Sequence, residues 1–132
     1  AELKNTIVIG ADTIVVRDGE ILGKPKDEAH AYEILLSLQG RAHEVYTGVA
    51  ILSYNNAGEI EIINHAVETK VHVHEMSEEE IRAYIATGDP MDKSGAYGIQ
   101  GSFAAYIDGI EGDYYNVVGL PVSYVYQQLK KC

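Results

Sequence analysis

The sequence predicts a single domain of the α/β class. Its 132 residues fit one domain and leave little room for a second. Short β-branched apolar runs, which are typical of strands, occur between segments of helical periodicity. Hydrophobic residues make up 46% of the chain and charged residues 23%, which is the composition of a globular protein with a packed core. No linker or internal repeat divides the chain, so we expect one domain over residues 1–132.

The first elements are predicted to be strands. Residues 6–10 form a β-branched apolar run that glycine ends, which indicates a short buried strand. Residues 13–17 and 20–23 flank the dipeptide Asp18-Gly19, which favours a two-residue hairpin turn. The chain therefore begins with a strand followed by a tight hairpin.

The remaining elements alternate between helices and strands. Apolar residues at helical spacing predict a helix over 27–39, and the pattern over 43–75 is that of strands. The capping-box pattern that begins at Ser77 predicts a helix ending near residue 88. A glycine- and tyrosine-rich stretch over 94–119 indicates loop and strand, and Pro121 is placed to begin a last helix.

The hairpin predicts which chemical groups are neighbours. In its register Arg17 lies opposite Glu20, a favourable cross-strand pair, and Thr13 lies opposite Lys24. Asp12, Thr13 and Lys24 are therefore expected together at the open end of the hairpin. Asp12 would also follow the carboxyl end of the first strand, where α/β sheets tend to bind ligands.

Asp12 is a carboxylate between two apolar runs, which is unfavourable unless it is paired, hydrogen-bonded or metal-bound. One interpretation is a structural ion pair between Asp12 and Lys24. The other is functional, because a carboxylate can orient water or hold Mg²⁺ and a lysine can neutralise phosphate. The hairpin alone leaves both interpretations open.

Other motifs carry weaker signals. The stretch GAYGIQG would let a backbone approach a ligand, with Gln100 offering an amide, but it is neither a P-loop nor a dinucleotide fingerprint. His72 and His74 share one face of a predicted strand, yet no third ligand has a suitable spacing, so a solvated strand face is favoured. Cys132, at the end of the chain, is a poor candidate for a nucleophile.

The composition limits the possible partners and location. A formal net charge of −10 argues against a broad nucleic-acid surface, although a small anion could still be bound by local lysines. No apolar run is long enough for a membrane span, and no signal peptide is recognisable. The single cysteine suits a reducing compartment, so we expect a cytoplasmic protein that binds no nucleic-acid polymer and no membrane.

Six segments, in order, resemble the Maf family of nucleotide pyrophosphatases. They are GADTIVV, ILGKPKD, HEVYTGVA, MSEEEI, DPMDKSGAYGIQG and GDYYNVVGLP. The resemblance implies hydrolysis of nucleoside triphosphates to the monophosphate and pyrophosphate, with a divalent cation, Mg²⁺ or Mn²⁺. It also implies a fold like that of inosine triphosphate pyrophosphatases, with a mixed twisted sheet and flanking helices, and a homodimer.

The resemblance assigns roles to four residues. Asp12 of ADT matches the catalytic acceptor and is the candidate metal ligand, and Lys24 of GKP matches a lysine that faces the phosphates. Thr13 and Gln100 match positions associated with base preference. The ADT and IQG forms are similar to the branch that acts on dTTP and UTP, so these nucleotides, and modified pyrimidine nucleotides, are the expected substrates.

The resemblance also has departures. Ser94 stands where alanine is usual. Family members begin with a strand and an S-x-R-R loop that nothing here matches, so we expect the N-terminal part of the family fold to be missing from this chain. The alternatives to an enzyme are a noncatalytic nucleotide-binding or septum-inhibiting regulatory module and, more weakly, a structural domain.

Overall fold

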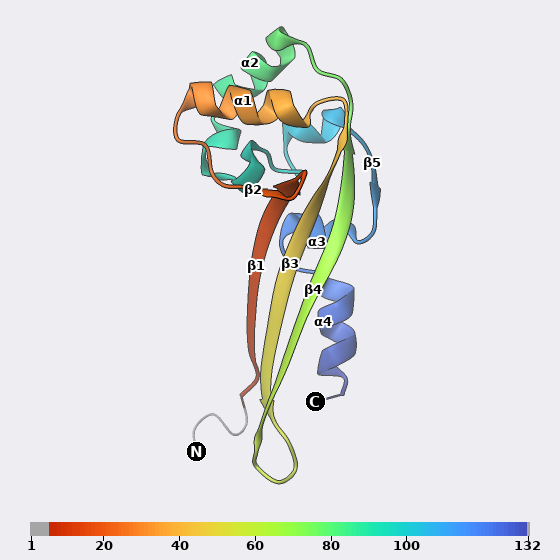
Figure 1. The fold of residues 1–132 in the computed structure, drawn as a ribbon. Helices are drawn as coiled ribbons and strands as arrows, with labels where there is room; N and C mark the ends of the chain where they lie inside the picture. Colours follow the sequence, from red (N-terminus) through yellow and green to blue (C-terminus); the bar gives the residue numbers. More distant parts are fainter. Residues whose placement is uncertain (1–5, 132) are drawn as a thin grey trace.

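The computed structural model describes residues 6–131, and the predictions made for Cys132 lie outside this range. Five strands form one sheet in the order β2-β1-β3-β4-β5, and each neighbouring pair is antiparallel. The strands are β1 (Val8–Arg17), β2 (Glu20–Leu22), β3 (Ala42–Tyr54), β4 (Ile60–Val73) and β5 (Ile107–Glu111). Helices flank this sheet (Figure 1), which confirms the predicted α/β class.

Four α-helices and three short 3₁₀ segments complete the described chain. The helices are α1 (Glu28–Leu38), α2 (Glu78–Ala86), α3 (Tyr114–Val118) and α4 (Val122–Leu129). The 3₁₀ segments are Asp89–Asp92, Ser94–Ala96 and Ser102–Tyr106. The predicted capping box is present, since Ser77 and Glu80 each accept the other's backbone N–H. None of the helices within residues 6–131 is long and apolar enough to cross a membrane.

Strand β1 is continuous, which corrects the prediction of two strands separated at residues 11–12. It pairs with β3 without interruption, and the pairs include Asp12 opposite Gly48 and Thr13 opposite Thr47. Hydrogen bonds along this ladder hold the backbone extended through Gly10, so the glycine does not end the strand. Asp12 consequently lies inside a strand rather than beyond the carboxyl end of one.

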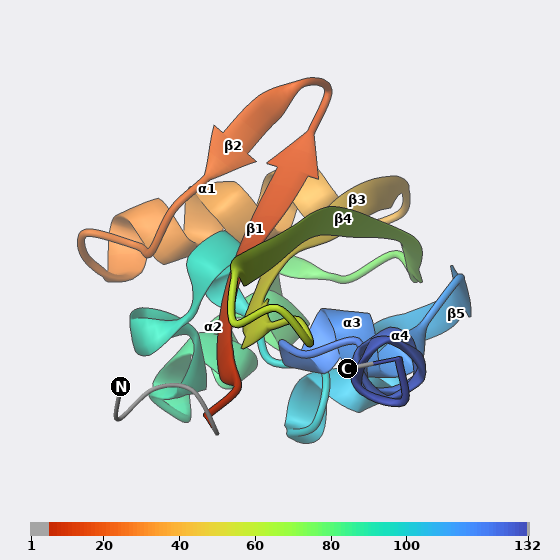
Figure 2. The ribbon, with the colours of Figure 1, turned by 90° about the horizontal axis from the view of Figure 1, so that it is seen from below.

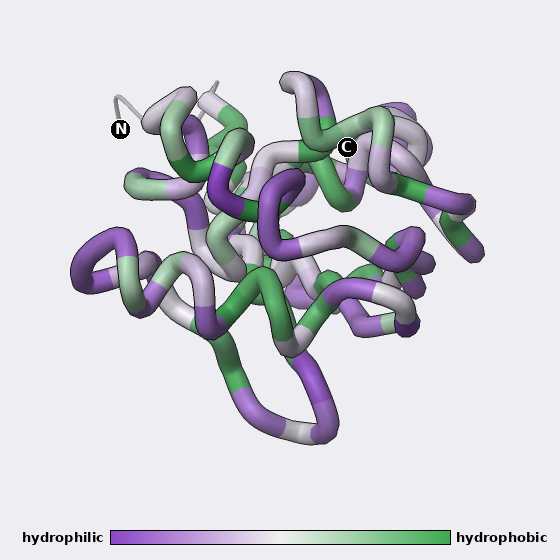
Figure 3. The backbone as a smooth tube through the Cα atoms, turned by 90° about the horizontal axis from the view of Figure 1, so that it is seen from above, coloured by the Kyte–Doolittle hydropathy of each residue, from purple (hydrophilic) through white to green (hydrophobic). Residues whose placement is uncertain are grey.

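The hairpin turn is formed as predicted. Asp18 and Gly19 both have positive φ angles, 51° and 79°, as a two-residue turn of this kind requires. Arg17 lies opposite Glu20 and forms an ion pair with it at 2.9 Å. Figure 3 shows this turn as a hydrophilic segment between two hydrophobic strand segments.

The β1–β2 ladder is shorter than the predicted one. It ends at Val15 opposite Leu22, so the expected pairing of Thr13 with Lys24 is not part of the ladder. From residue 8 to residue 14, β1 pairs with β3 on one side, and no described strand pairs with it on the other. The backbone of β1 is therefore an open edge beside the end of β2.

The helices cover one face of the sheet, and Figure 2 shows α3 and α4 below β3 and β4 in that view. Alternate residues of β3 face the helices and are buried. They are His43, Val45, Thr47, Val49, Ile51 and Ser53. The intervening residues are exposed or half-buried, and so are Asp12 and Ala66, which flank Gly48 in the ladder. We call the side of the sheet that carries Asp12, Gly48 and Ala66 the open face.

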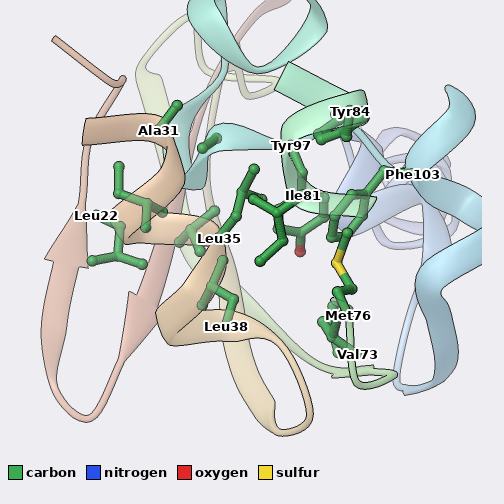
Figure 4. Packing of buried hydrophobic residues seen from close by; sticks show 14 of the residues in the cluster. Leu22, Ala31, Leu35, Leu38, Val73, Met76, Ile81, Tyr84, Tyr97 and Phe103 are labelled. Carbon is green, nitrogen blue, oxygen red and sulfur yellow. The ribbon is translucent and has the colours of Figure 1, made fainter. Parts of the chain in front are cut away.

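Two apolar clusters hold the helices on the sheet. The main one packs α1 and α2 against the upper part of the sheet and includes Leu35, Ile81 and Phe103, each fully buried (Figure 4). A smaller cluster lies further down the sheet, where Val125 of α4 packs on Val49 and Ile51. Most of the apolar burial that stabilises the fold therefore lies at the α1–α2 end.

Candidate functional site

A cavity of about 510 Å³ lies between β1 and the segment of residues 89–101. Three of the four predicted site residues line it: Thr13, Lys24 and Gln100. Thr13 comes from β1, Lys24 follows β2, and Gln100 lies in the loop before the last 3₁₀ segment. The fold thus brings together side chains that are far apart in the sequence. The volume is in the usual range for small-molecule sites.

Asp12, the fourth predicted residue, does not line this cavity. It lies on the open face beside Gly48 and Ala66, because successive side chains of a strand point to opposite faces. The structure thus brings Thr13 and Lys24 together in one cavity and places Asp12 on the other face of the sheet. Asp12 and the cavity are separated by the backbone of β1 at its open edge.

The alternative of a structural ion pair between Asp12 and Lys24 is also wrong. Within residues 6–131, neither side chain makes a hydrogen bond or an ion pair. Asp12 is exposed on a strand with no strand pairing beside it, and Lys24 is exposed as well. Within this part of the chain neither charge is held by a bonded partner, although the charge of Lys24 helps to lower the pKa of Asp92.

The hydroxyl of Thr13 is held by a short chain of hydrogen bonds. The two hydroxyl oxygens of Thr13 and Thr47 lie 2.8 Å apart, and Thr47 donates to the backbone oxygen of Asn116 at 3.0 Å. Because Thr47 uses its proton on that carbonyl, the Thr13 hydroxyl is the donor between the two, and it also lies 3.4 Å from the backbone oxygen of Gly119, a second acceptor for the same proton. The oxygen of Thr13 keeps acceptor capacity, so it can accept a hydrogen bond from a ligand.

Two carboxylates and a second lysine in the cavity wall escaped the sequence analysis. Lys93 lies between Asp89 and Asp92, at 3.3 Å and 2.9 Å from their oxygens. Hydrogen bonding to Lys93 holds the pKa of Asp92 below its ordinary value, and the same bond raises the pKa of Lys93. The sequence signal for them is the charge cluster DPMDK, which directly precedes the glycine-rich stretch.

Gly95 fixes the cavity wall against β1. Its φ angle is 75°, and a Cβ atom there would lie 2.8–2.9 Å from three side-chain atoms of Val15. The N–H of Gly95 also donates to the carbonyl of Gly23 at 3.1 Å, next to Lys24. Only glycine allows this close approach, which holds the segment before Gln100 against the strand that carries Thr13.

A buried pair, His43 and Tyr97, supports the cavity from behind. The Nε2 atom of His43 lies 2.6 Å from the Tyr97 hydroxyl, and the ring of Tyr97 lines the cavity. Burial lowers the pKa of His43 to about 4, helped by the nearby positive groups Arg41 and His72, and burial raises the pKa of Tyr97. The imidazole is therefore neutral and the phenol protonated at neutral pH.

His43 is expected to make the fold acid-sensitive. Its folded-state pKa of about 4 lies below the ordinary value of 6.5, so only the unfolded chain binds a proton between these pH values. The free energy of unfolding should therefore fall by about 3 kcal/mol as pH drops from 6.5 to 4. Urea titrations across this range should show that the free energy of unfolding falls less with pH in His43→Gln than in the unchanged chain. An equal dependence on pH in the two proteins would contradict the assignment.

His72, in β4, and His74, which follows β4, face acids on β5. The Nε2 atom of His72 lies 2.6 Å from Glu111, and that of His74 lies 3.5 Å from Asp108. Bonding to His72 lowers the pKa of Glu111. Across the described residues, no three His, Cys, Asp or Glu side chains are grouped closely enough to hold a metal ion.

Comparison with known proteins identifies the family. The family model described as Maf-like protein matches residues 1–132. The chain belongs to the Maf-like protein family. This agrees with the resemblance seen in the sequence motifs and with the observed sheet and flanking helices.

Several relatives of this Maf-like chain are called "dTTP/UTP pyrophosphatase". One from Lachnoclostridium phytofermentans is 54% identical over 127 residues, which are 96% of the chain and 64% of the relative. One from Dictyoglomus turgidum is 54% identical over 121 residues, 92% of the chain and 61% of the relative. One from Koribacter versatilis is 52% identical over 131 residues, 99% of the chain and 65% of the relative. The Maf-like chain thus spans somewhat less than two thirds of the length of these relatives.

Proposed function

We propose that the protein hydrolyses dTTP and UTP to the nucleoside monophosphate and pyrophosphate. The observation that carries the proposal is the cavity in which Thr13, Lys24 and Gln100 meet although they come from separate segments. The name shared by the relatives supports the same substrates. The proposal concerns the whole protein, of which this chain supplies the cavity.

Lys24 would bind the phosphates. Both lysines in the cavity wall are cationic, but Lys93 is bound to two aspartates, whereas Lys24 has no such partner within residues 6–131. An ammonium group that is not neutralised by a carboxylate offers its full charge to a phosphate oxygen. Lys24 is therefore the cation of this wall that a triphosphate would engage.

Asp12 would act as the general base, from the open face of the sheet rather than from the cavity side. A water molecule attacks the α-phosphorus, forming a new P–O bond while the bond to the bridging oxygen breaks and pyrophosphate leaves. The carboxylate of Asp12 accepts the proton of this water. Asp12 directly precedes the cavity residue Thr13 on β1, and no described strand lies along this edge of β1 at residues 8–14.

Thr13 and Gln100 would recognise the base of the nucleotide by hydrogen bonding. Thymine and uracil present an N–H group between two carbonyls, and the oxygen of Thr13 retains acceptor capacity for such a donor. The amide of Gln100 can donate to one of the neighbouring carbonyls. Cytosine lacks this N–H group, and purines need a wider pocket. The arrangement therefore favours dTTP and UTP.

A divalent cation, Mg²⁺ or Mn²⁺, would enter with the triphosphate. The charged residues of the cavity wall are two lysines and two aspartates, so their formal charges cancel and leave the phosphates to be neutralised. Asp89 and Asp92 are bound to Lys93, whereas Asp12 has a free carboxylate and is the candidate protein ligand. The bound ion would reduce the negative charge of the phosphates.

The test compares two neighbouring lysines. Lys24→Ala should raise the KM for dTTP at least tenfold, because a charged hydrogen bond to phosphate contributes roughly 1.5–3 kcal/mol. Lys26→Ala is the matched control, since Lys26 is exposed nearby but does not line the cavity. Pyrophosphate release would be measured with dTTP, UTP, ATP and GTP.

Two outcomes would contradict the proposal. If ATP or GTP were the better substrate, the assignment of the base would be wrong. If Lys24→Ala and Lys26→Ala behaved alike, the cavity would not be the phosphate site. Nucleotide binding without any hydrolysis would instead favour the noncatalytic nucleotide-binding module.

We also infer a homodimer in the cytoplasm. Exposed apolar side chains gather on α3 and α4, which is a common property of surfaces that bind another protein. They are Tyr114, Tyr115, Val118, Leu120, Val122 and Tyr126. The single cysteine supports the reducing compartment.

A further inference from the structure

Tyr84 of α2 lies behind the cavity and does not line it. Its side chain is 3% exposed and packs against Phe103, beside Tyr97 (Figure 4). Its hydroxyl donates to the carboxylate of Asp89 and accepts the backbone N–H of Gly98 at 3.1 Å. One hydroxyl thus connects a helix, a cavity carboxylate and the turn that carries Gln100.

The turn of residues 98–101 is wrapped around the carboxylate of Asp89. A Cβ atom on Gly98 would lie 3.6 Å from Oδ2 of Asp89, and one on Gly101 would lie 3.4 Å from the same oxygen. On Gly98 it would also approach Cε of Lys93 to 2.9 Å, so the Lys93 side chain would have to shift. The turn therefore passes close to the carboxylate that accepts the Tyr84 hydroxyl.

We propose that the Tyr84 hydroxyl is a positioning group for Gln100 and thereby sets the preference for thymine and uracil. The inference rests on the proposed function of the cavity. Gln100 is exposed at the cavity wall, and no hydrogen bond of its side chain to residues 6–131 holds it. Its place therefore depends on the turn, which is held by the bond from Gly98 to Tyr84 and by the buried side chain of Ile99.

The phenol is suited to this role because it keeps its proton. Burial raises the pKa of Tyr84, as does its hydrogen bond to Asp89. The hydroxyl therefore remains a donor to the carboxylate and an acceptor for the Gly98 N–H at neutral pH. Phenylalanine would fill the same space but leave the buried N–H and one carboxylate oxygen without this partner.

The test is Tyr84→Phe in the complete protein. Losing one hydrogen bond of ordinary strength should raise the KM for dTTP about fivefold, with a smaller change in kcat. The preference for dTTP over dCTP, as a ratio of kcat/KM, should fall by a similar factor. Amide exchange at Gly98 should be faster in the variant.

The matched control is Tyr106→Phe, which removes a hydroxyl from the same aromatic cluster. Tyr106 packs on Phe103, and its hydroxyl makes no hydrogen bond to the turn within the described chain. This variant should keep the KM, the base preference and the Gly98 exchange rate.

The outcomes separate this inference from the proposed function. An unchanged dTTP preference in Tyr84→Phe, with faster exchange at Gly98, would make the hydroxyl merely structural and overturn the inference alone. A protein that does not hydrolyse dTTP before any substitution would overturn the proposed function, and the inference with it. Equal effects of Tyr84→Phe and Tyr106→Phe would assign the change to the aromatic cluster rather than to the bond.

Discussion

Asp12→Asn is expected to lower the rate of dTTP hydrolysis by roughly 10²–10⁴-fold, the usual contribution of a general base. Asparagine keeps the size of the side chain but cannot accept the proton of the attacking water. The melting temperature should not fall, because Asp12 is exposed and makes no side-chain hydrogen bond within residues 6–131. Single-turnover measurements of pyrophosphate release, beside thermal unfolding, would separate the two effects.

The control for Asp12 is another carboxylate-to-amide change on an exposed strand position. Glu61→Gln on β4 is suitable, since Glu61 is exposed and pairs with Ser53 rather than with β1. It should leave the rate unchanged. A near-normal rate in a folded Asp12→Asn protein would remove Asp12 from the reaction and leave Asp92, on the cavity side of β1, as the carboxylate to test.

Gly95→Ala is expected to destabilise the fold by about 3 kcal/mol. The methyl group would be forced into the side chain of buried Val15, and the positive φ angle of Gly95 adds backbone strain. The melting temperature should fall by roughly 10 °C for a domain of this size. Calorimetry or urea unfolding would measure the effect.

Two further variants separate the two causes of the stability loss in Gly95→Ala, the contact with Val15 and the backbone strain. Gly58 has a similar φ angle of 77° but no atom within 4 Å of an added Cβ, so Gly58→Ala should show only the smaller cost of the backbone. In a double-mutant cycle, Val15→Ala should recover part of the loss in Gly95→Ala, with an interaction term of about 1–2 kcal/mol. If both glycine variants lost the same stability, the contact with Val15 would not be responsible.

Local chemistry was sufficient to predict the hairpin and the start of α2, whereas α3 (Tyr114–Val118) lies in a stretch that was predicted as loop and strand. The turn residues Asp18 and Gly19 fix the register, since few other pairs take two positive φ angles in succession. Ser77 and Glu80 likewise fix the start of α2. These features depend on residues that are close in the sequence, so they can be predicted without knowledge of the tertiary contacts.

The position of Asp12 depended on a distant strand and could not be predicted in that way. Gly10 is a usual strand-ending signal, but its pairing with Ala50 of β3 keeps the backbone extended. Once β1 is known to be continuous, alternation places Asp12 and Thr13 on opposite faces. Lys24 and Gln100 were predicted from motifs, whereas their meeting in one cavity required the fold.

The β3–β4 hairpin ends in a turn that is organised by a single side chain. Oδ1 of Asn55 accepts the N–H groups of Ala57 and Glu59, each at 2.9 Å. The turn lies at the far end of the long strands from α1 and α2 (Figure 1), and within the described chain the small cluster around Val125 packs on the strands between the turn and the main core. Lengthening the chain between Asn56 and Gly58 would add loop entropy at the tip without disturbing the cavity. The tip is therefore the natural point for inserting an affinity tag, a fluorophore or a cross-linker into a working protein.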